Sequence, residues 1–187
     1  MSWILASASP RRRQLLKDLV DDFEVIPATG EERVDTTLSP AEQCKALAVQ
    51  KAREIASKNA GRYVLGADTV VAVEDTVLGK PKDEEDARRM LRLLSGRTHD
   101  VFTGVCIVAP DGREFSAVDG TQVRFYPLDE AFIEAYVKGG SPMDKAGAYG
   151  IQDGGLVEGI DGSYTNVVGL PIELCDRLIT KIKESEK

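Results

Sequence analysis

Short runs of β-prone residues alternate with helix-start signals from one end of this sequence to the other. An apolar run over residues 3–6 leads into Ser9-Pro10, a capping residue followed by proline at the first helical position. A capping box at residues 39–42 opens a second helix that reaches about residue 57. This alternation predicts an α/β fold with a mixed, twisted sheet.

The rest of the chain carries the same signals without an internal repeat, a low-complexity tract or a linker. We therefore expect a single domain over residues 1–187. Further strands are predicted at 23–26, 63–67, 69–73, 76–78, 101–109 and 114–125. The strands at 69–73 and 76–78 form a predicted hairpin that turns at Glu74-Asp75. Further helices are predicted from Asp83, over 129–137, and from Pro171 to the end of the apolar stripe near Ile182.

The charge balance limits the partners. The chain of 187 residues has 24 basic and 31 acidic residues, which gives a net charge of −7. A negative protein repels duplex nucleic acid and anionic lipid, so any polyanion must meet a local basic pocket. The apolar runs are far shorter than the ~20 residues of a membrane span, and no secretory signal opens the chain. We expect a cytoplasmic protein without a nucleic-acid or membrane partner.

Cysteine and histidine usage excludes other chemistries. Cys44, Cys106 and Cys175 are odd in number, far apart and never in a C-x-x-C pair, which argues against a disulfide framework and a zinc ribbon. Cys175 is expected on the inner face of the last helix. The single histidine, His99, leaves little room for Ser-His-Asp or Cys-His catalysis, and we expect a polar residue at a strand entrance.

Residues 7–13, Ser-Ala-Ser-Pro-Arg-Arg-Arg, join the first strand to the first helix. A helix N-terminus offers unpaired N–H groups and partial positive charge, which attract phosphate. Arginines at this end are unfavourable unless an anion compensates them. The stretch therefore indicates an anion site, with a solvated basic turn as the alternative.

Lys51 and Asp68 are charged residues in positions that predict burial. Lys51 falls within the apolar stripe of its helix, so it needs an anionic partner unless it snorkels to water. Asp68 follows the apolar run 63–65, which predicts a carboxylate at the carboxyl end of a central strand, where open α/β sheets bind ligands. A metal ion, a lysine or a water network should lie beside it, unless it caps the following turn.

Gly79-Lys80-Pro81 and Glu31-Glu32 are weaker signals. Glycine lets the backbone approach a ligand and proline stiffens the loop that presents Lys80, but the pattern is not a Walker A loop. Glu31-Glu32 adds acidic groups from a loop, although charged loops are usually solvated.

Several short stretches have distinctive sequences and follow one another in a distinctive order. They are 5–12 (LASASPRR), 66–71 (GADTVV), 78–81 (LGKP), 94–99 (LSGRTH), 103–105 (TGV), 144–152 (DKAGAYGIQ) and 166–171 (NVVGLP). Together they resemble the Maf family of nucleotide pyrophosphatases over nearly the whole chain. Residues 143–152 resemble the branch acting on dTTP and UTP rather than the branch that prefers 7-methyl-GTP.

The resemblance implies an elongated sheet, two lobes around a central cleft, and hydrolysis of a nucleoside triphosphate to monophosphate and pyrophosphate. It also implies a divalent cation, Mg or Mn, and suggests a homodimer. It makes Asp68 the catalytic proton acceptor and associates substrate selection with Arg11, Thr69 and Gln152. The remaining polar positions of the cleft match Ser7, Arg12, Lys51 and Lys80 for phosphate, and Glu32 with Asp68 for metal.

Elementary chemistry agrees with this interpretation. Cleavage between the α and β phosphates requires neutralising about four negative charges and delivering water in line to phosphorus. Asp68 either takes the proton or only holds the metal, and both roles are open. Gln152 presents a donor beside an acceptor, which suits the N3–H and O4 edge of uracil or thymine, although a flipped amide also pairs with cytosine.

The sequence therefore predicts a metal-dependent dTTP/UTP pyrophosphatase. One alternative is a purine triphosphate pyrophosphatase of the inosine-triphosphate type. The other is a non-catalytic regulator that binds nucleotide or nucleic acid through the arginines at 11–13, against which the net charge of −7 counts.

Overall fold

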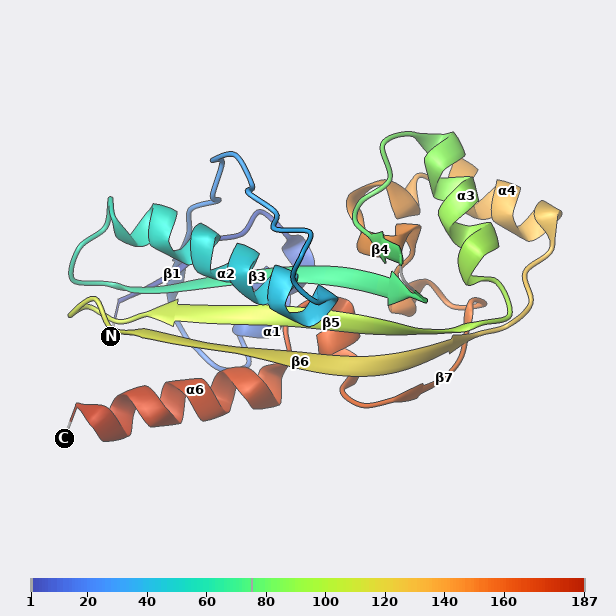
Figure 1. Ribbon diagram of the computed structural model, residues 1–187. Coiled ribbons are helices and arrows are strands. Elements are labelled where there is room, and N and C mark those ends of the chain that lie inside the picture. Colours follow the sequence, from blue (N-terminus) through green and yellow to red (C-terminus); the bar gives the residue numbers. More distant parts are fainter. Residues whose placement is uncertain (1, 75, 187) are drawn as a thin grey trace.

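A seven-stranded mixed sheet forms the centre of the computed structural model, which describes residues 2–74 and 76–186 (Figure 1). Its strands are β1 (Trp3–Leu5), β2 (Phe23–Val25), β3 (Tyr63–Val73), β4 (Thr76–Leu78), β5 (Thr98–Val108), β6 (Glu114–Phe125) and β7 (Val157–Asp161). They lie in the order β2-β1-β3-β5-β6-β7, with β4 paired to β3. The antiparallel strands β3, β5 and β6 run through the whole molecule, whereas β1 is parallel to β2 and β3. The predicted mixed α/β class is confirmed.

One edge of β3 is covered by strands only at its two ends. β5 occupies the other edge along residues 64–72. β1 pairs with residues 63–65 and β4 with residues 71–73. Within the described part of the chain, residues 66–70 have no strand partner on the edge that β1 and β4 share. β1 ends there because Ser9-Pro10 start α1 (Pro10–Leu16), with the Ser9 side chain accepting from a backbone N–H of the first turn.

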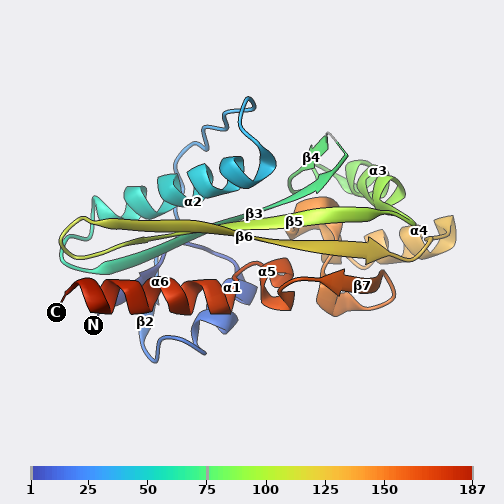
Figure 2. The same ribbon diagram turned by 60° about the horizontal axis from the view of Figure 1, so that its bottom comes forward.

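Helices cover both faces of the sheet half that contains β1 (Figure 2). α2 (Pro40–Ala56), opened by the predicted capping box, lies on one face. α1 and α6 (Ile172–Ser185) lie on the opposite face. Alternate β3 side chains enter the two cores, since Leu65 packs with α1 and α6 while Val64 packs with α2. Asp68 and Thr69, which are consecutive, therefore point to opposite faces.

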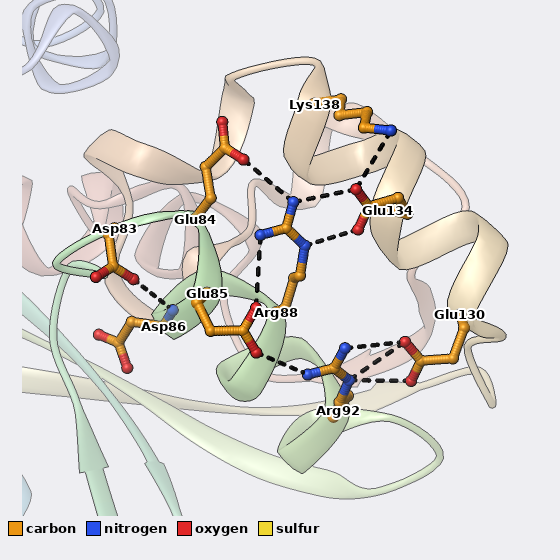
Figure 3. Close-up of polar contacts among 9 residues, drawn as sticks. All are labelled: Asp83, Glu84, Glu85, Asp86, Arg88, Arg92, Glu130, Glu134 and Lys138. Carbon is orange, nitrogen blue, oxygen red and sulfur yellow. Dashed lines mark hydrogen bonds and ion pairs between the residues drawn. The ribbon is translucent and has the colours of Figure 1, made fainter.

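A second lobe covers the far half of the long strands. α3 (Glu84–Leu94) and α4 (Glu130–Lys138) pack there around a core that includes the fully buried Leu91 and Phe125. On its surface, Arg88 and Arg92 of α3 pair with glutamates of α4 (Figure 3). The connection back to α6 contains η1 (Ser141–Asp144), η2 (Ala146–Ala148), η3 (Ile151–Asp153), β7 and α5 (Tyr164–Val168).

The structure corrects one prediction that concerns the site. The strand predicted to end at residue 67 continues through Asp68 to Val73, because β5 pairs with it along residues 64–72. Asp68 thus lies in the middle of β3, and it is the parallel strand β1 that ends beside it. The short elements between 141 and 168 were not predicted, and the predicted turn at Glu74-Asp75 falls partly on Asp75, outside the described residues.

The histidine and the cysteines belong to the core. This was predicted for Cys175, whereas His99 was predicted as a polar residue at a strand entrance. His99 is the second residue of β5, is 2% exposed and shares a 2.8 Å hydrogen bond between its Nε2 and the Tyr149 hydroxyl. Burial lowers the pKa of His99 to about 4, so it is neutral at pH 7. Burial raises the pKa of each thiol, Cys44, Cys106 and Cys175, to about 12. Among the described residues, no helix has the length and apolar character needed to cross a bilayer.

Candidate active site

A cavity of about 670 Å³ lies at the uncovered edge of β3, with walls from both lobes. The β1–α1 connection and α2 supply one side, and β4 and the 144–152 segment supply the other. The lining contains all the site residues predicted from the sequence: Ser7, Arg11, Arg12, Glu32, Lys51, Asp68, Thr69, Lys80 and Gln152. Because the cavity opens at a strand edge, both Asp68 and Thr69 reach it although they point to opposite faces.

The cavity carries excess positive charge in an acidic protein. Five cationic side chains and three carboxylates line it, whereas the whole chain has a net charge of −7. The cations are Arg11, Arg12, Lys51, Lys80 and Lys145, and the carboxylates are Glu32, Asp68 and Asp144. An excess of one sign of charge between low-dielectric walls concentrates the electric field in a cleft, so this cavity attracts an anion.

Lys51 is the meeting point of two carboxylates. Its Nζ lies 2.9 Å from Oε1 of Glu32 and in direct contact with Oδ1 of Asp68. The side chains of Lys51 and Asp68 are 19% and 12% exposed, and that of Glu32 is 53% exposed. Lys51 therefore has the anionic partner that its position within an apolar stripe requires, and the Asp68 carboxylate faces the cavity.

Two glycines bring α2 close enough to the sheet for this contact. A Cβ on Gly66 would lie 2.6 Å from the carbonyl oxygen of Ala48, and one on Gly104 would lie 2.5 Å from that of Cys44. Gly104 of β5 is the register partner of Asp68. Glycine at these positions permits the close approach of helix and strand backbones, and that approach places Lys51 beside Asp68.

Arg12 contacts Thr69, on the face of β3 opposite to Asp68, and its hydrogen-bond partners are uncharged. Its Nε donates to the carbonyl of Gly169 at 2.7 Å, its Nη1 to Ser7 Oγ at 3.3 Å and its Nη2 to Thr69 Oγ1 at 3.0 Å. Guanidinium has five N–H donors, so two remain for a ligand. Burial lowers the pKa of Arg12, and the nearby Asp68 opposes that shift. Arginine nevertheless stays charged, so Arg12 presents a partly buried cation toward the cavity.

A second ion pair joins the two sides of the cavity. Nη1 of Arg11 donates to Oδ2 of Asp144 at 2.9 Å, and Nζ of Lys145 lies 2.9 Å from the other carboxylate oxygen. Lys145 also donates to the backbone carbonyl of Ser141. Asp144 and Lys145 were not predicted as site residues, although the charged pair stands inside one of the stretches that carry the resemblance. Thr103 and Asn166, which lie behind Thr69, were not predicted as site residues either, although each begins one of those stretches.

The remaining predicted residues lie at the rim. Lys80 is exposed on the loop after β4, whose Gly79 carbonyl accepts from the backbone N–H of Gly147 at 3.0 Å. Gln152 is exposed in η3. Glu32 lines the cavity, whereas Glu31 is exposed and is not among the lining residues.

The donor set of Glu32 and Asp68 fits a divalent cation shared with a phosphate ligand. Both carboxylates converge on the ammonium of Lys51, so they already surround a point of positive charge. Mg²⁺ usually takes one or two carboxylates and completes its shell with water and substrate phosphate. No cluster of three or more His, Cys, Asp or Glu side chains is found within residues 2–74 and 76–186 to hold a metal without such help.

Solved structures show the same fold. The Ham1 protein of Staphylococcus aureus matches with a TM-score of 0.55 over 100% of both chains at 16% identity. A HAM1 protein from Coxiella burnetii matches with a TM-score of 0.54, covering 97% of this chain and 99% of that chain at 14% identity. At these identities the likeness concerns the fold alone, and it agrees with the predicted elongated sheet.

Sequence comparisons are more specific. A protein of Thermococcus gammatolerans named dTTP/UTP pyrophosphatase is 52% identical over 177 residues, 94% of each chain. Proteins of the same name from Carboxydothermus hydrogenoformans and Ruminiclostridium cellulolyticum are 49% identical, with 98% of each chain covered, and 43% identical, with 97% of this chain and 96% of the relative covered. The family model described as Maf-like protein matches residues 2–182. The chain therefore belongs to the Maf-like protein family.

Proposed function

We propose that this protein hydrolyses dTTP and UTP between the α and β phosphates, releasing the nucleoside monophosphate and pyrophosphate with the help of a divalent cation. The observation that carries the proposal is the pair of carboxylates, Glu32 and Asp68, that meet at Lys51 inside a cavity with excess positive charge. The cavity volume of about 670 Å³ lies within the range of small-ligand sites. The names of the full-length relatives at 43–52% identity support the same activity.

In this proposal the cationic side chains bind the triphosphate. Arg12 offers two free N–H donors, and arginine's planar fork matches phosphate oxygens. Lys51 and Lys80 act as point charges from opposite sides of the cavity. Arg11 joins the two lobes through its ion pair with Asp144. To bind a phosphate, Arg11 would have to exchange that carboxylate for the phosphate.

Asp68 is the proposed proton acceptor. Its carboxylate lies inside the cavity in direct contact with the Lys51 ammonium group. Glu32 and Asp68 would hold the cation, which supplies charge neutralisation and lowers the pKa of a bound water. Lys51 orients both carboxylates in the absence of ligand. Gln152, on η3 at the rim, is the proposed reader of the uracil or thymine edge.

Product identification tests this proposal. Purified protein is incubated with UTP, dTTP, CTP, GTP and ITP, with Mg²⁺, Mn²⁺ or a chelator, and the products are separated by ion-exchange chromatography. We expect UMP, dTMP and pyrophosphate, strongest for UTP and dTTP, and no turnover with chelator. Release of orthophosphate, preference for ITP, or full activity in chelator would contradict the proposal.

We also propose that the protein acts on free nucleotides in the cytoplasm, as a homodimer and without nucleic acid. The negative net charge of −7 supports the last point. Light scattering during gel filtration tests the dimer, and a salt-dependent DNA-binding assay tests the absence of nucleic-acid binding.

A further inference from the structure

Two hydroxyl groups flank Arg12 in the cavity, and hydrogen bonds fix the direction of each proton. Ser7 Oγ accepts from the backbone N–H of Ser9 at 3.2 Å and from Nη1 of Arg12 at 3.3 Å. A hydroxyl has two acceptor positions and one proton. Both acceptor positions of Ser7 are occupied, so Ser7 presents its proton to the cavity.

Thr69 has the opposite arrangement. Its Oγ1 accepts from Nη2 of Arg12 at 3.0 Å and lies 2.9 Å from the Thr103 hydroxyl. Thr103 in turn lies 3.0 Å from the carbonyl oxygen of Asn166, which can only accept. Thr103 has one proton, and it must donate this proton to the Asn166 carbonyl for that contact to be a hydrogen bond. The contact between the two threonines is then a hydrogen bond only if Thr69 donates to Thr103. The Thr69 proton therefore points away from the cavity, and one lone pair is left for a ligand.

The two residues that set this direction, Thr103 and Asn166, are buried and hydrogen-bonded to each other. Thr103 and Asn166 are both 0% exposed, and Thr103 is not among the cavity-lining residues. The Asn166 side chain donates to the carbonyl of Val101 at 2.9 Å and to Thr121 Oγ1 at 3.0 Å, which fastens α5 to β5 and β6. The Asn166 carbonyl is thereby held under Thr103.

We propose that Thr103 is a positioning residue for substrate selection, because it makes Thr69 an acceptor toward the cavity while Ser7 remains a donor. The inference rests on the proposed function and names what each hydroxyl recognises. Phosphate oxygens are acceptors and match Ser7 and Arg12. Thr69 matches an N–H or O–H of the nucleoside, and UTP and dTTP share two such donors, the base N3–H and the 3′-hydroxyl. N3 of cytosine carries a lone pair instead.

Substitution of Thr103 tests the inference. Thr103→Val removes the relay at nearly constant volume, and Thr103→Ser retains it. Ile107→Val is the control for core packing, because Ile107 is a fully buried residue of the same strand whose register partner on β3 is Leu65 rather than Thr69. The readouts are two ratios of kcat/KM, UTP over CTP and UTP over 3′-deoxy-UTP.

In Thr103→Val we expect one of these ratios to fall by about five- to tenfold, the effect of one directed hydrogen bond. A fall in UTP over CTP identifies N3–H as the partner of Thr69, and a fall in UTP over 3′-deoxy-UTP identifies the 3′-hydroxyl. Thr103→Ser and Ile107→Val should keep both ratios. Unchanged ratios in Thr103→Val, or an equal loss in Thr103→Ser, overturn the inference.

Two further measurements keep the test decisive. If Thr103→Val does not fold, as judged by circular dichroism, Thr69→Val removes the acceptor itself and should change the same ratio; an unchanged ratio overturns the inference. If the wild type cleaves no triphosphate, the proposed function fails on its own. Calorimetric binding of UMP, CMP and 3′-deoxy-UMP to wild type and Thr103→Val then replaces turnover, and identical preferences in both proteins overturn the inference.

Discussion

The α3–α4 surface and the cavity are both rich in charge but are organised in opposite ways (Figure 3). On the α3–α4 surface, Arg88 lies 2.7 Å from Glu134 and Arg92 lies 3.0 Å from Glu130, so each of these two arginines has a carboxylate partner on the neighbouring helix. In the cavity the cations outnumber the carboxylates, and the hydrogen-bond partners of Arg12 among the described residues are neutral.

This difference separates charge that joins two helices from charge that attracts a ligand. Exposed ion pairs contribute little to stability, because water and salt screen them and long side chains lose freedom. Where cations outnumber carboxylates in a cavity, an incoming polyanion neutralises the excess charge. Removing a charge should therefore affect activity in the cavity and affect only stability, slightly, on the α3–α4 surface.

The largest expected effect is that of Asp68→Asn. It removes a carboxylate from the cavity without changing its size, and we expect turnover to fall by about a hundredfold or more, the scale of a missing acid–base group. Circular dichroism should show an unchanged fold. Glu31→Gln, an exposed neighbour of the site outside the lining, is the matched control and should retain full turnover. Near-normal activity of Asp68→Asn would remove Asp68 from its proposed role.

Gly104→Ala tests whether backbone packing places the cavity charges. The new Cβ would lie 2.5 Å from the Cys44 carbonyl, so α2 must shift and carry Lys51 away from Asp68. We expect about 1–3 kcal/mol less stability, together with a clear loss of kcat. Gly120→Ala is a milder comparison, because its Cβ would meet the ring edge of Phe102 at 2.9 Å rather than backbone. Equal activity in the two variants would contradict this account.

Mild acid should destabilise the protein through His99 and not through the α3–α4 pairs. The pKa of His99 is about 4 in the fold against 6.5 for the free side chain. The unfolded chain therefore binds the proton first, and stability is lost as pH falls from 6.5 toward 4, by about 2 kcal/mol at pH 5. The pKa values of Glu130 and Glu134 are lowered below 4.5 by their arginine partners, so these pairs stay ionised at pH 5.

Urea unfolding at pH 7 and pH 5 measures this loss, and His99→Gln should abolish most of it. An equal loss in His99→Gln would assign the acid response to other groups.

The smallest expected effect is that of Arg88→Gln on the α3–α4 surface. It breaks pairs between the half-buried Arg88 and the exposed carboxylates of Glu84 and Glu134, so Tm should fall by a few degrees and the fall should shrink in high salt. Steady-state kinetics should show an unchanged kcat/KM. A large loss of activity would show that the two charged regions are coupled.

Much of the molecule was predictable because its signals are local. The caps at Ser9 and Ser39 and the apolar stripes of the helices act over a few residues, and the structure has each of them where it was predicted. The stretches that carry the family resemblance contain seven of the nine predicted lining residues, and Glu32 and Lys51 lie outside these stretches. The short 3-10 turns, β7 and α5 were missed, because they are held by contacts with distant strands rather than by their own periodicity.

The sequence by itself determined the alternating elements, the buried positions of Lys51 and Asp68, and the chemistry available to the site. Only the tertiary structure decided that β1 and β4 leave the middle of β3 uncovered, so that Asp68 and Thr69 reach one cavity from opposite faces. It also decided the direction of the Thr69 proton, which depends on Thr103 and on the carbonyl of Asn166. Periodicity reports which face a residue occupies, whereas an uncovered strand edge and a chain of hydrogen bonds depend on how distant segments pack together.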